Sequence, residues 1–68
     1  MSMYKIHYKM SNGEEYDQYF DLEVVADARI SQIMRGKHDW LHCFNQSHEP
    51  TGIINVTQIV SMLKVKIL

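Results

Sequence analysis

Four side chains of the types that bind zinc lie within one short window of the sequence. His38 and His42 are four residues apart, Cys43 follows directly, and His48 is downstream. A pair four apart shares one face only on a helix, and Gly36 indicates that the preceding helix has already ended. On a strand, His42 and Cys43 project to opposite faces. We therefore expect no metal site, and instead surface histidines beside a small buried thiol.

Cys43 beside a histidine also has the residue types of a thiol nucleophile and its base. Adjacency in the sequence does not place the imidazole within hydrogen-bonding distance of the sulfur, and no third group is indicated that would orient the histidine. The three glycines are isolated, so no phosphate-binding loop is present. We expect no catalytic residues, no cofactor and no enzymatic activity.

Most of the acidic residues lie in one stretch. No Lys or Arg interrupts residues 14–27, although the whole chain has eight acidic residues against seven Lys and Arg. Paired carboxylates can act as acid and base, but a hairpin leaves these on an open surface without a pocket. One interpretation is a charged face that keeps a sheet edge soluble. The other is a partner-binding surface, because tyrosine is favoured at binding hot spots. Its residues are Glu14, Glu15, Tyr16, Asp17, Tyr19, Asp21 and Glu23.

The first two elements are predicted to form a β-hairpin. Alternating apolar and polar residues predict a half-buried strand over residues 4–10, and a second alternating run follows Asn12-Gly13. We prefer a three-residue loop over 11–13, with Gly13 in the left-handed conformation, to a two-residue loop. Only the longer loop sorts polar and apolar side chains onto separate faces and opposes unlike charges. It predicts the pairs Tyr4–Phe20, His7–Asp17, Tyr8–Tyr16 and Lys9–Glu15.

After Val25 the hydrophobic period changes from that of a strand to that of a helix. Asp27 suits the N-cap and Gly36 the position after the last turn, which predicts a helix of about nine residues. Arg29 is expected to lie away from the apolar stripe, which consists of Ala26, Ile30, Ile33 and Met34.

Three further strands are predicted at 40–44, 53–56 and 62–68, with a single turn at 57–60. The order of elements is ββαβββ. We therefore predict a single α+β domain over residues 1–68, in which a small antiparallel sheet of four to five strands accompanies one short helix.

The small size of the chain predicts an oligomer. Sixty-eight residues bury little more apolar surface than is needed to offset the conformational entropy of folding, and a single cysteine cannot form an internal disulfide. A two-fold homodimer is the commonest closed assembly. We expect its interface at a sheet edge or on the aromatic segment that carries Trp40, His42 and Phe44.

The remaining composition limits the partners and the compartment. No apolar run spans a bilayer and no signal peptide precedes the first strand, so we expect a cytoplasmic protein without a membrane partner. A net charge of −1 lacks the basic footprint of a dedicated nucleic-acid binder, so a nucleic-acid partner is not expected. One alternative stays open: a small nucleic-acid or nucleotide-binding module. It would use Lys5, Lys9, Lys64 and Lys66, which lie together if the first and last strands pair.

Several pieces of the sequence resemble a class of known proteins. They are the Asn-Gly hairpin, a short helix that ends in Arg35-Gly36-Lys37, an aromatic strand around Trp40, and the closing pattern Ile54-Asn55-x-x-x-Ile59-Val60-x-Met62. This organisation resembles that of very short proteins carried by phages and mobile elements of low-GC Gram-positive bacteria.

The second predicted strand has a more particular resemblance. The run Gly13-Glu14-Glu15-Tyr16-Asp17-Gln18-Tyr19 is similar to a strand of the small dimeric phage inhibitors of uracil-DNA glycosylase, whose acid-rich face looks like DNA to the enzyme. The resemblance implies a non-enzymatic, phage-type interaction protein that binds and inhibits or modulates a host protein in the host cytoplasm. It also implies a partner with a basic surface or a DNA-binding groove, and a DNA mimic as the sharpest form of the function.

Overall fold

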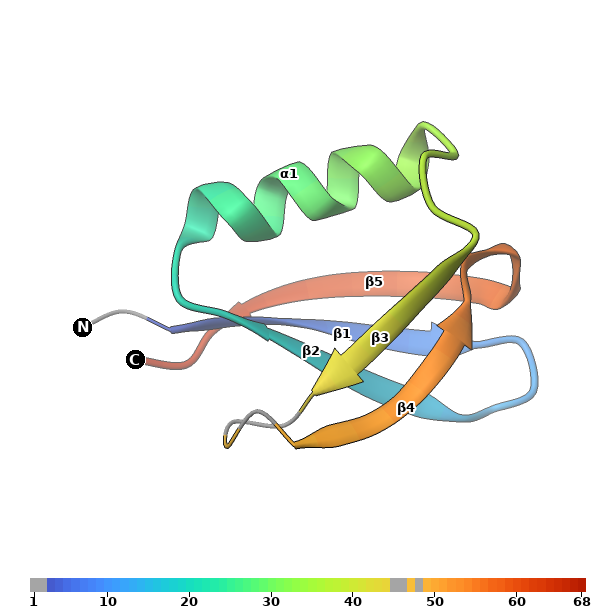
Figure 1. The fold of residues 1–68 in the computed structure, drawn as a ribbon, viewed down its shortest axis with the longest axis horizontal. Coiled ribbons are helices and arrows are strands. Elements are labelled where there is room, and N and C mark those ends of the chain that lie inside the picture. Colours follow the sequence, from blue (N-terminus) through green and yellow to red (C-terminus); the bar gives the residue numbers. More distant parts are fainter. Residues whose placement is uncertain (1–2, 45–46, 48) are drawn as a thin grey trace.

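The computed structural model of the chain describes residues 3–44, 47 and 49–68. It confirms the α+β class and the order ββαβββ (Figure 1). The elements are β1 (Tyr4–Met10), β2 (Glu15–Phe20), α1 (Glu23–Met34), β3 (Trp40–Phe44), β4 (Pro50–Asn55), the 3₁₀ helix η1 (Val56–Gln58) and β5 (Ile59–Lys66).

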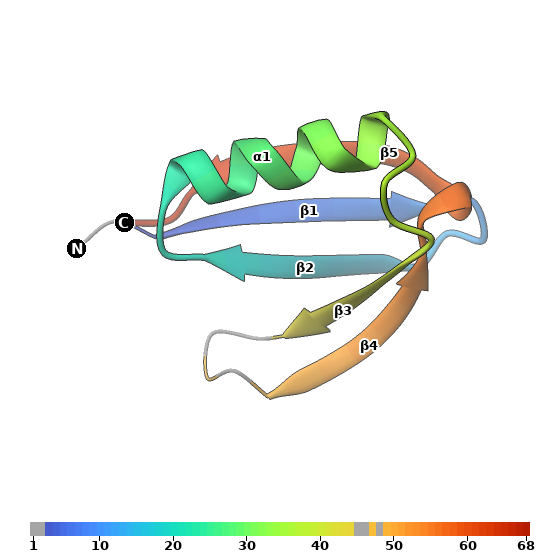
Figure 2. The same ribbon diagram turned by 45° about the horizontal axis from the view of Figure 1, so that its top comes forward.

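The five strands are divided between two antiparallel sheets instead of one. A three-stranded sheet has the order β2-β1-β5, and a two-stranded sheet pairs β3 with β4. Helix α1 covers one face of the three-stranded sheet, and the β3–β4 hairpin stands beside β2 (Figure 2). None of the described helices and strands covers the opposite face of the three-stranded sheet (Figure 2), which we call the open side.

The β1–β2 hairpin has the predicted register. All four expected pairs are present, from Tyr4–Phe20 to Lys9–Glu15. Gly13 has φ of 90°, a left-handed conformation that glycine adopts at little cost. The Asn12 side-chain oxygen accepts a hydrogen bond from the Glu14 amide at 2.9 Å, which supports the turn from within.

Helix α1 starts earlier than predicted and ends as predicted. Its N-cap is Leu22, which has no side-chain oxygen to cap the helix, so the expected cap at Asp27 was wrong. At the other end Gly36 has φ of 72° and its amide bonds to the Ile33 carbonyl at 3.1 Å. The Lys37 amide then bonds to the Gln32 carbonyl at 2.9 Å, which completes a Schellman motif.

The carboxylate of Asp27 is used elsewhere. Lys64 of β5 places its ammonium 2.6 Å from Asp27 Oδ1 and 2.8 Å from Glu23 Oε2. These hydrogen bonds raise the pKa of Lys64, the one to Asp27 most strongly. The first turns of α1 are therefore tied to the edge strand of the sheet by an exposed ion-pair cluster.

The hydrophobic core lies between the three-stranded sheet, α1 and the β3–β4 hairpin. Its buried members are Ile6, Tyr8, Met10, Ala26, Ile33, Leu41, Cys43 and Ile54. Strand β5 contributes little to it, because Met62 and Lys64 face the helix side while Leu63 faces the open side with 61% of its surface exposed.

One buried polar side chain connects the two sheets. Gln18 of β2 accepts a hydrogen bond from the Tyr8 hydroxyl at 2.6 Å, and its amide nitrogen donates to the His42 carbonyl of β3 at 3.2 Å. Among the described residues, Gln18 is the only polar or charged residue that is buried. Burial also raises the pKa of Tyr8, so its hydroxyl stays protonated as a donor.

We predict that Tyr8→Phe lowers the free energy of unfolding by about 1–3 kcal/mol, because it leaves the buried Gln18 oxygen without its donor. Urea unfolding followed by circular dichroism measures the change. Tyr19→Phe is the matched control, since it removes a hydroxyl from the partly exposed end of β2, and we expect a change within about 0.5 kcal/mol. Equal stability of the two variants would contradict the role of the Tyr8–Gln18 bond.

Candidate functional site

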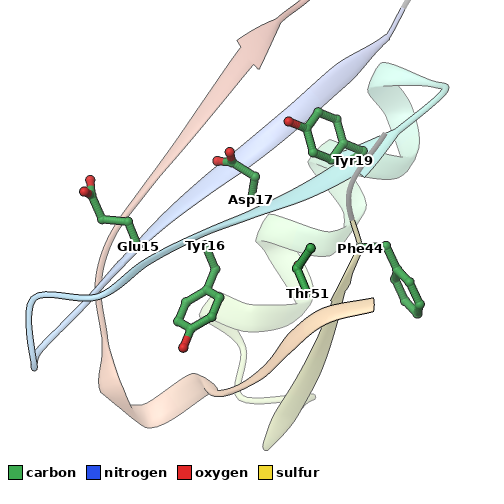
Figure 3. A pocket seen from close by; sticks show the side chains of 6 residues that line it. All are labelled: Glu15, Tyr16, Asp17, Tyr19, Phe44 and Thr51. Atoms are coloured by element: carbon green, nitrogen blue, oxygen red, sulfur yellow. The ribbon is translucent and has the colours of Figure 1, made fainter. Parts of the chain in front are cut away.

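A shallow groove runs along the outer edge of β2. It has a volume of about 300 Å³ and is bounded by β2 on one side and by the facing ends of β3 and β4 on the other (Figure 3). We call it the β2 groove. Its lining residues are Glu15, Tyr16, Asp17, Tyr19, Phe44 and Thr51.

Strand alternation decides how these side chains are presented. Glu15, Asp17 and Tyr19 project from one side of β2, whereas Tyr16 projects from the other, toward β4 (Figure 3). The Tyr16 ring passes so close to Gly52 that a Cβ atom there would lie 2.9 Å from its Cε1 atom. Gly52 therefore allows β4 to approach β2 and to close this side of the groove.

The acidic side of the groove is balanced by β1. His7 lies between two carboxylates, with Nδ1 2.6 Å from Asp17 Oδ1 and Nε2 2.8 Å from Glu15 Oε1. The hydrogen bond to Asp17, followed by that to Glu15, raises the pKa of His7. Lys5 is a weaker partner of Asp17 at 3.5 Å. The two carboxylates are thus oriented by their neighbours but keep an exposed side.

The seven predicted partner-binding residues do not form one continuous strip. Four of them line the β2 groove, while Glu14 lies in the hairpin and accepts a hydrogen bond from the Tyr16 hydroxyl. Asp21 is exposed beyond the end of β2, and Glu23 lies on the helix beside Lys64. The groove places two carboxylates beside three aromatic rings.

Two of the groove residues were not expected there. Phe44 was assigned to a dimer interface, together with Trp40 and His42, and all three lie on the exposed face of β3. Thr51 was not singled out, because the segment before residue 53 was predicted to be a loop, whereas β4 begins at Pro50. Extending the predicted strand back to residue 50 would have placed Thr51 beside β2.

The four lysines of the alternative interpretation do not form one basic surface. Strands β1 and β5 pair, but Lys64 lies opposite Ile6 and Lys66 opposite Tyr4. Directly paired residues share a face, so both lysines lie on the helix side. Lys5 and Lys9 lie on the open side, opposite Val65 and Ser61. The premise of a shared Lys-bearing face is therefore wrong.

Alternation also separates two residues of the window that holds His38, His42, Cys43 and His48, where no metal site was expected. Cys43 is buried and His42 is exposed on the opposite face of β3. Burial raises the pKa of Cys43 to about 11, so the sulfur is held as a thiol and not as the nucleophilic thiolate. His48 lies outside the described residues. Within the ranges 3–44 and 49–68, no three His, Cys, Asp or Glu side chains converge in a way that could hold a metal ion.

Comparison with known proteins gave no match to a protein-family model, to a curated protein or to a solved structure. No helix among the described residues is long and apolar enough to cross a membrane.

The position of His7 between two carboxylates predicts a pH-dependent stability. A histidine whose pKa is raised by folding stabilises the protein fully below its unfolded pKa of 6.5, and this stabilisation is lost as pH rises through the folded value. We expect wild type to exceed His7→Gln in unfolding free energy at pH 5.5 and this advantage to shrink by pH 8.5. Urea unfolding at each pH measures it.

The matched control repeats the comparison in a Glu15→Gln/Asp17→Asn background. There the carboxylates that hold the imidazolium are absent, so the His7→Gln effect should no longer vary with pH. An advantage that persists unchanged to pH 8.5 in the natural background would show that the two carboxylates do not favour the charged histidine.

Proposed function

We propose that the protein is a non-enzymatic, phage-type interaction protein that binds and inhibits or modulates a host protein in the host cytoplasm. The β2 groove carries this proposal, because it places Glu15 and Asp17 beside the aromatic rings of Tyr16, Tyr19 and Phe44. Among the described residues that line the groove, none is Lys, Arg or His. A partner with a basic surface fits this chemistry.

The groove suits an arginine or lysine side chain of the partner. A guanidinium forms charge-assisted hydrogen bonds with carboxylates and also stacks on aromatic faces. Tyrosine contributes a large contact area at a low cost in conformational entropy, which explains its frequency at binding hot spots. In this arrangement the exposed oxygens of Glu15 and Asp17 would pair with the positive charge of the partner's side chain, and the aromatic rings would pack against its apolar stem.

The sharpest form of the proposal is a DNA mimic. Glu15 and Asp17 lie on the same side of β2, where successive side chains are about 6.6 Å apart, close to the spacing of phosphates along a nucleic-acid strand. The resemblance of residues 13–19 to the phage inhibitors of uracil-DNA glycosylase makes that enzyme the first partner to test. A carboxylate pair in its DNA-binding groove would occupy the place of the substrate backbone.

We predict that the protein slows uracil excision by a uracil-DNA glycosylase of a low-GC Gram-positive bacterium. Glu15→Gln/Asp17→Asn should lower the association rate by about tenfold at low salt, because it removes the charges that steer encounter with a basic groove. Stopped-flow mixing at two salt concentrations measures the rate, and circular dichroism verifies the fold.

Glu23→Gln/Asp27→Asn is the matched control. It removes the same charge from the helix and from outside the β2 groove, so the association rate should stay within about twofold of wild type. If both double variants slow association equally, net charge and not the β2 groove controls binding. If Glu15→Gln/Asp17→Asn does not change the association rate, the β2 groove does not take part in the interaction.

We also propose a two-fold homodimer that pairs β5 with β5 of a second copy. Strand β5 is an edge of its sheet, and it exposes Val60 and Leu63. Edge strands are protected by lysines, but the ammonium of Lys64 is drawn toward α1 by its two carboxylates. Antiparallel pairing centred on Leu63 opposes Lys64 to Met62 of the second copy, whereas centring on Lys64 would oppose two like charges.

Light scattering should give twice the monomer mass of 8.0 kDa at micromolar concentration. Leu63→Lys should produce a monomer, because it places like charges at the centre of the interface. Val24→Lys, which changes an exposed residue of α1, should leave the dimer intact. A mass of 8.0 kDa with a melting temperature independent of concentration would contradict the dimer.

A further inference from the structure

A second cleft lies between β2, β3 and α1. Its volume is about 420 Å³, within the range of small-molecule sites, and the described residues that line it include no carboxylate. We call it the Arg29 cleft. The side chains that define its chemistry are Phe20, Arg29, His38, Trp40, His42 and Phe44.

Arg29 in this cleft has an unmet need for an acceptor. Its guanidinium carbon lies 5.9 Å from the centroid of the Phe20 ring, and its Nε atom is buried without a hydrogen-bond partner in the described structure. The ion pairs of the described residues involve Lys5, His7 and Lys64 but not Arg29. A partly buried cation is costly unless an anion compensates it. An anionic group in the cleft would therefore compensate the charge of Arg29.

Trp40 gives the same cleft an aromatic platform. It is 59% exposed, which is unusual for the largest side chain of a small protein, and it shares the outer face of β3 with Phe44. Two imidazoles stand beside it, and His38 is held in place by the Gln32 side chain at 2.9 Å. Basic side chains next to exposed rings are the arrangement that stacks nucleobases.

We propose that the Arg29 cleft binds a nucleotide, with the base against Trp40 and a phosphate at Arg29. The required chemistry is a planar ring that carries an anion, and it is the same in a free nucleotide and in one unit of a single strand. This function goes beyond the acidic β2 groove, with which the cleft shares only Tyr19 and Phe44. It uses none of the four lysines.

Trp40 is the single tryptophan of the chain, so its fluorescence reports on the cleft directly. Titration of the full chain with AMP should quench it in a saturable manner. Adenosine and inorganic phosphate, which each supply half of the required chemistry, should bind at least about tenfold more weakly. A short oligodeoxyadenylate distinguishes the two sources. If the cleft binds single-stranded nucleic acid, the oligodeoxyadenylate should bind more tightly than AMP and its affinity should fall more steeply with salt. If the cleft binds free nucleotides, neither difference should appear.

Arg29→Gln should weaken AMP binding by at least about tenfold, and Arg29→Lys should restore part of the loss. Arg35→Gln removes an exposed arginine from the end of α1 and should leave binding unchanged. Trp40→Leu alters an exposed side chain, and calorimetry should show that it also abolishes binding. Circular dichroism checks that each variant folds.

Three results would overturn the proposal. One is the absence of saturable quenching up to millimolar AMP. Another is an equal effect of Arg29→Gln and Arg35→Gln in folded proteins. The third is tryptophan emission that changes with protein concentration but not with AMP, because a second copy would then cover Trp40.

Discussion

The two hydrogen bonds of Gln18 set the relation between the two sheets. In the described structure no backbone ladder joins β2 to β3. The hairpin is held against the larger sheet by this amide, by the packing of Leu41, Cys43 and Ile54 into the core, and by the Tyr16 ring against Gly52. Both the β2 groove and the Arg29 cleft have walls from β2 and β3, completed by β4 in the groove and by α1 in the cleft. A buried amide whose oxygen and nitrogen both have partners favours one arrangement of a core, and here that arrangement creates both surfaces.

Local patterns predicted the parts of the fold that lie close together in the sequence. The register of β1 and β2 follows from side-chain alternation and from the loop that ends at Gly13, because only one register sorts the faces. Gly36 marked the end of α1 for a similar local reason. The start of α1 was missed because Leu22 offers no capping oxygen, while Asp27 looks like a cap but pairs with Lys64.

The candidate sites depend on long-range contacts, which the alternation of residues along a strand does not predict. The sequence grouped the acids of residues 14–23, but the fold distributes them between a groove, a turn and a helix. Arg29 is three residues after Ala26 and four before Ile33, a spacing that places it beside the buried face of α1, although it was expected to lie away from the apolar stripe. Only the position of β3 reveals that it shares a cleft with Trp40, and that position depends on a long-range contact.

The most direct test is an NMR measurement on the side-chain amide of Gln18, which gives the rate at which its Nε2 protons exchange with solvent and their nuclear Overhauser effects to nearby protons. If β3 stands beside β2 as described, the Nε2 protons exchange slowly with solvent and show effects to the backbone of His42 and Cys43. Fast exchange and no such effects would contradict it, because β3 would then not be fixed against β2 and neither surface would have its shape.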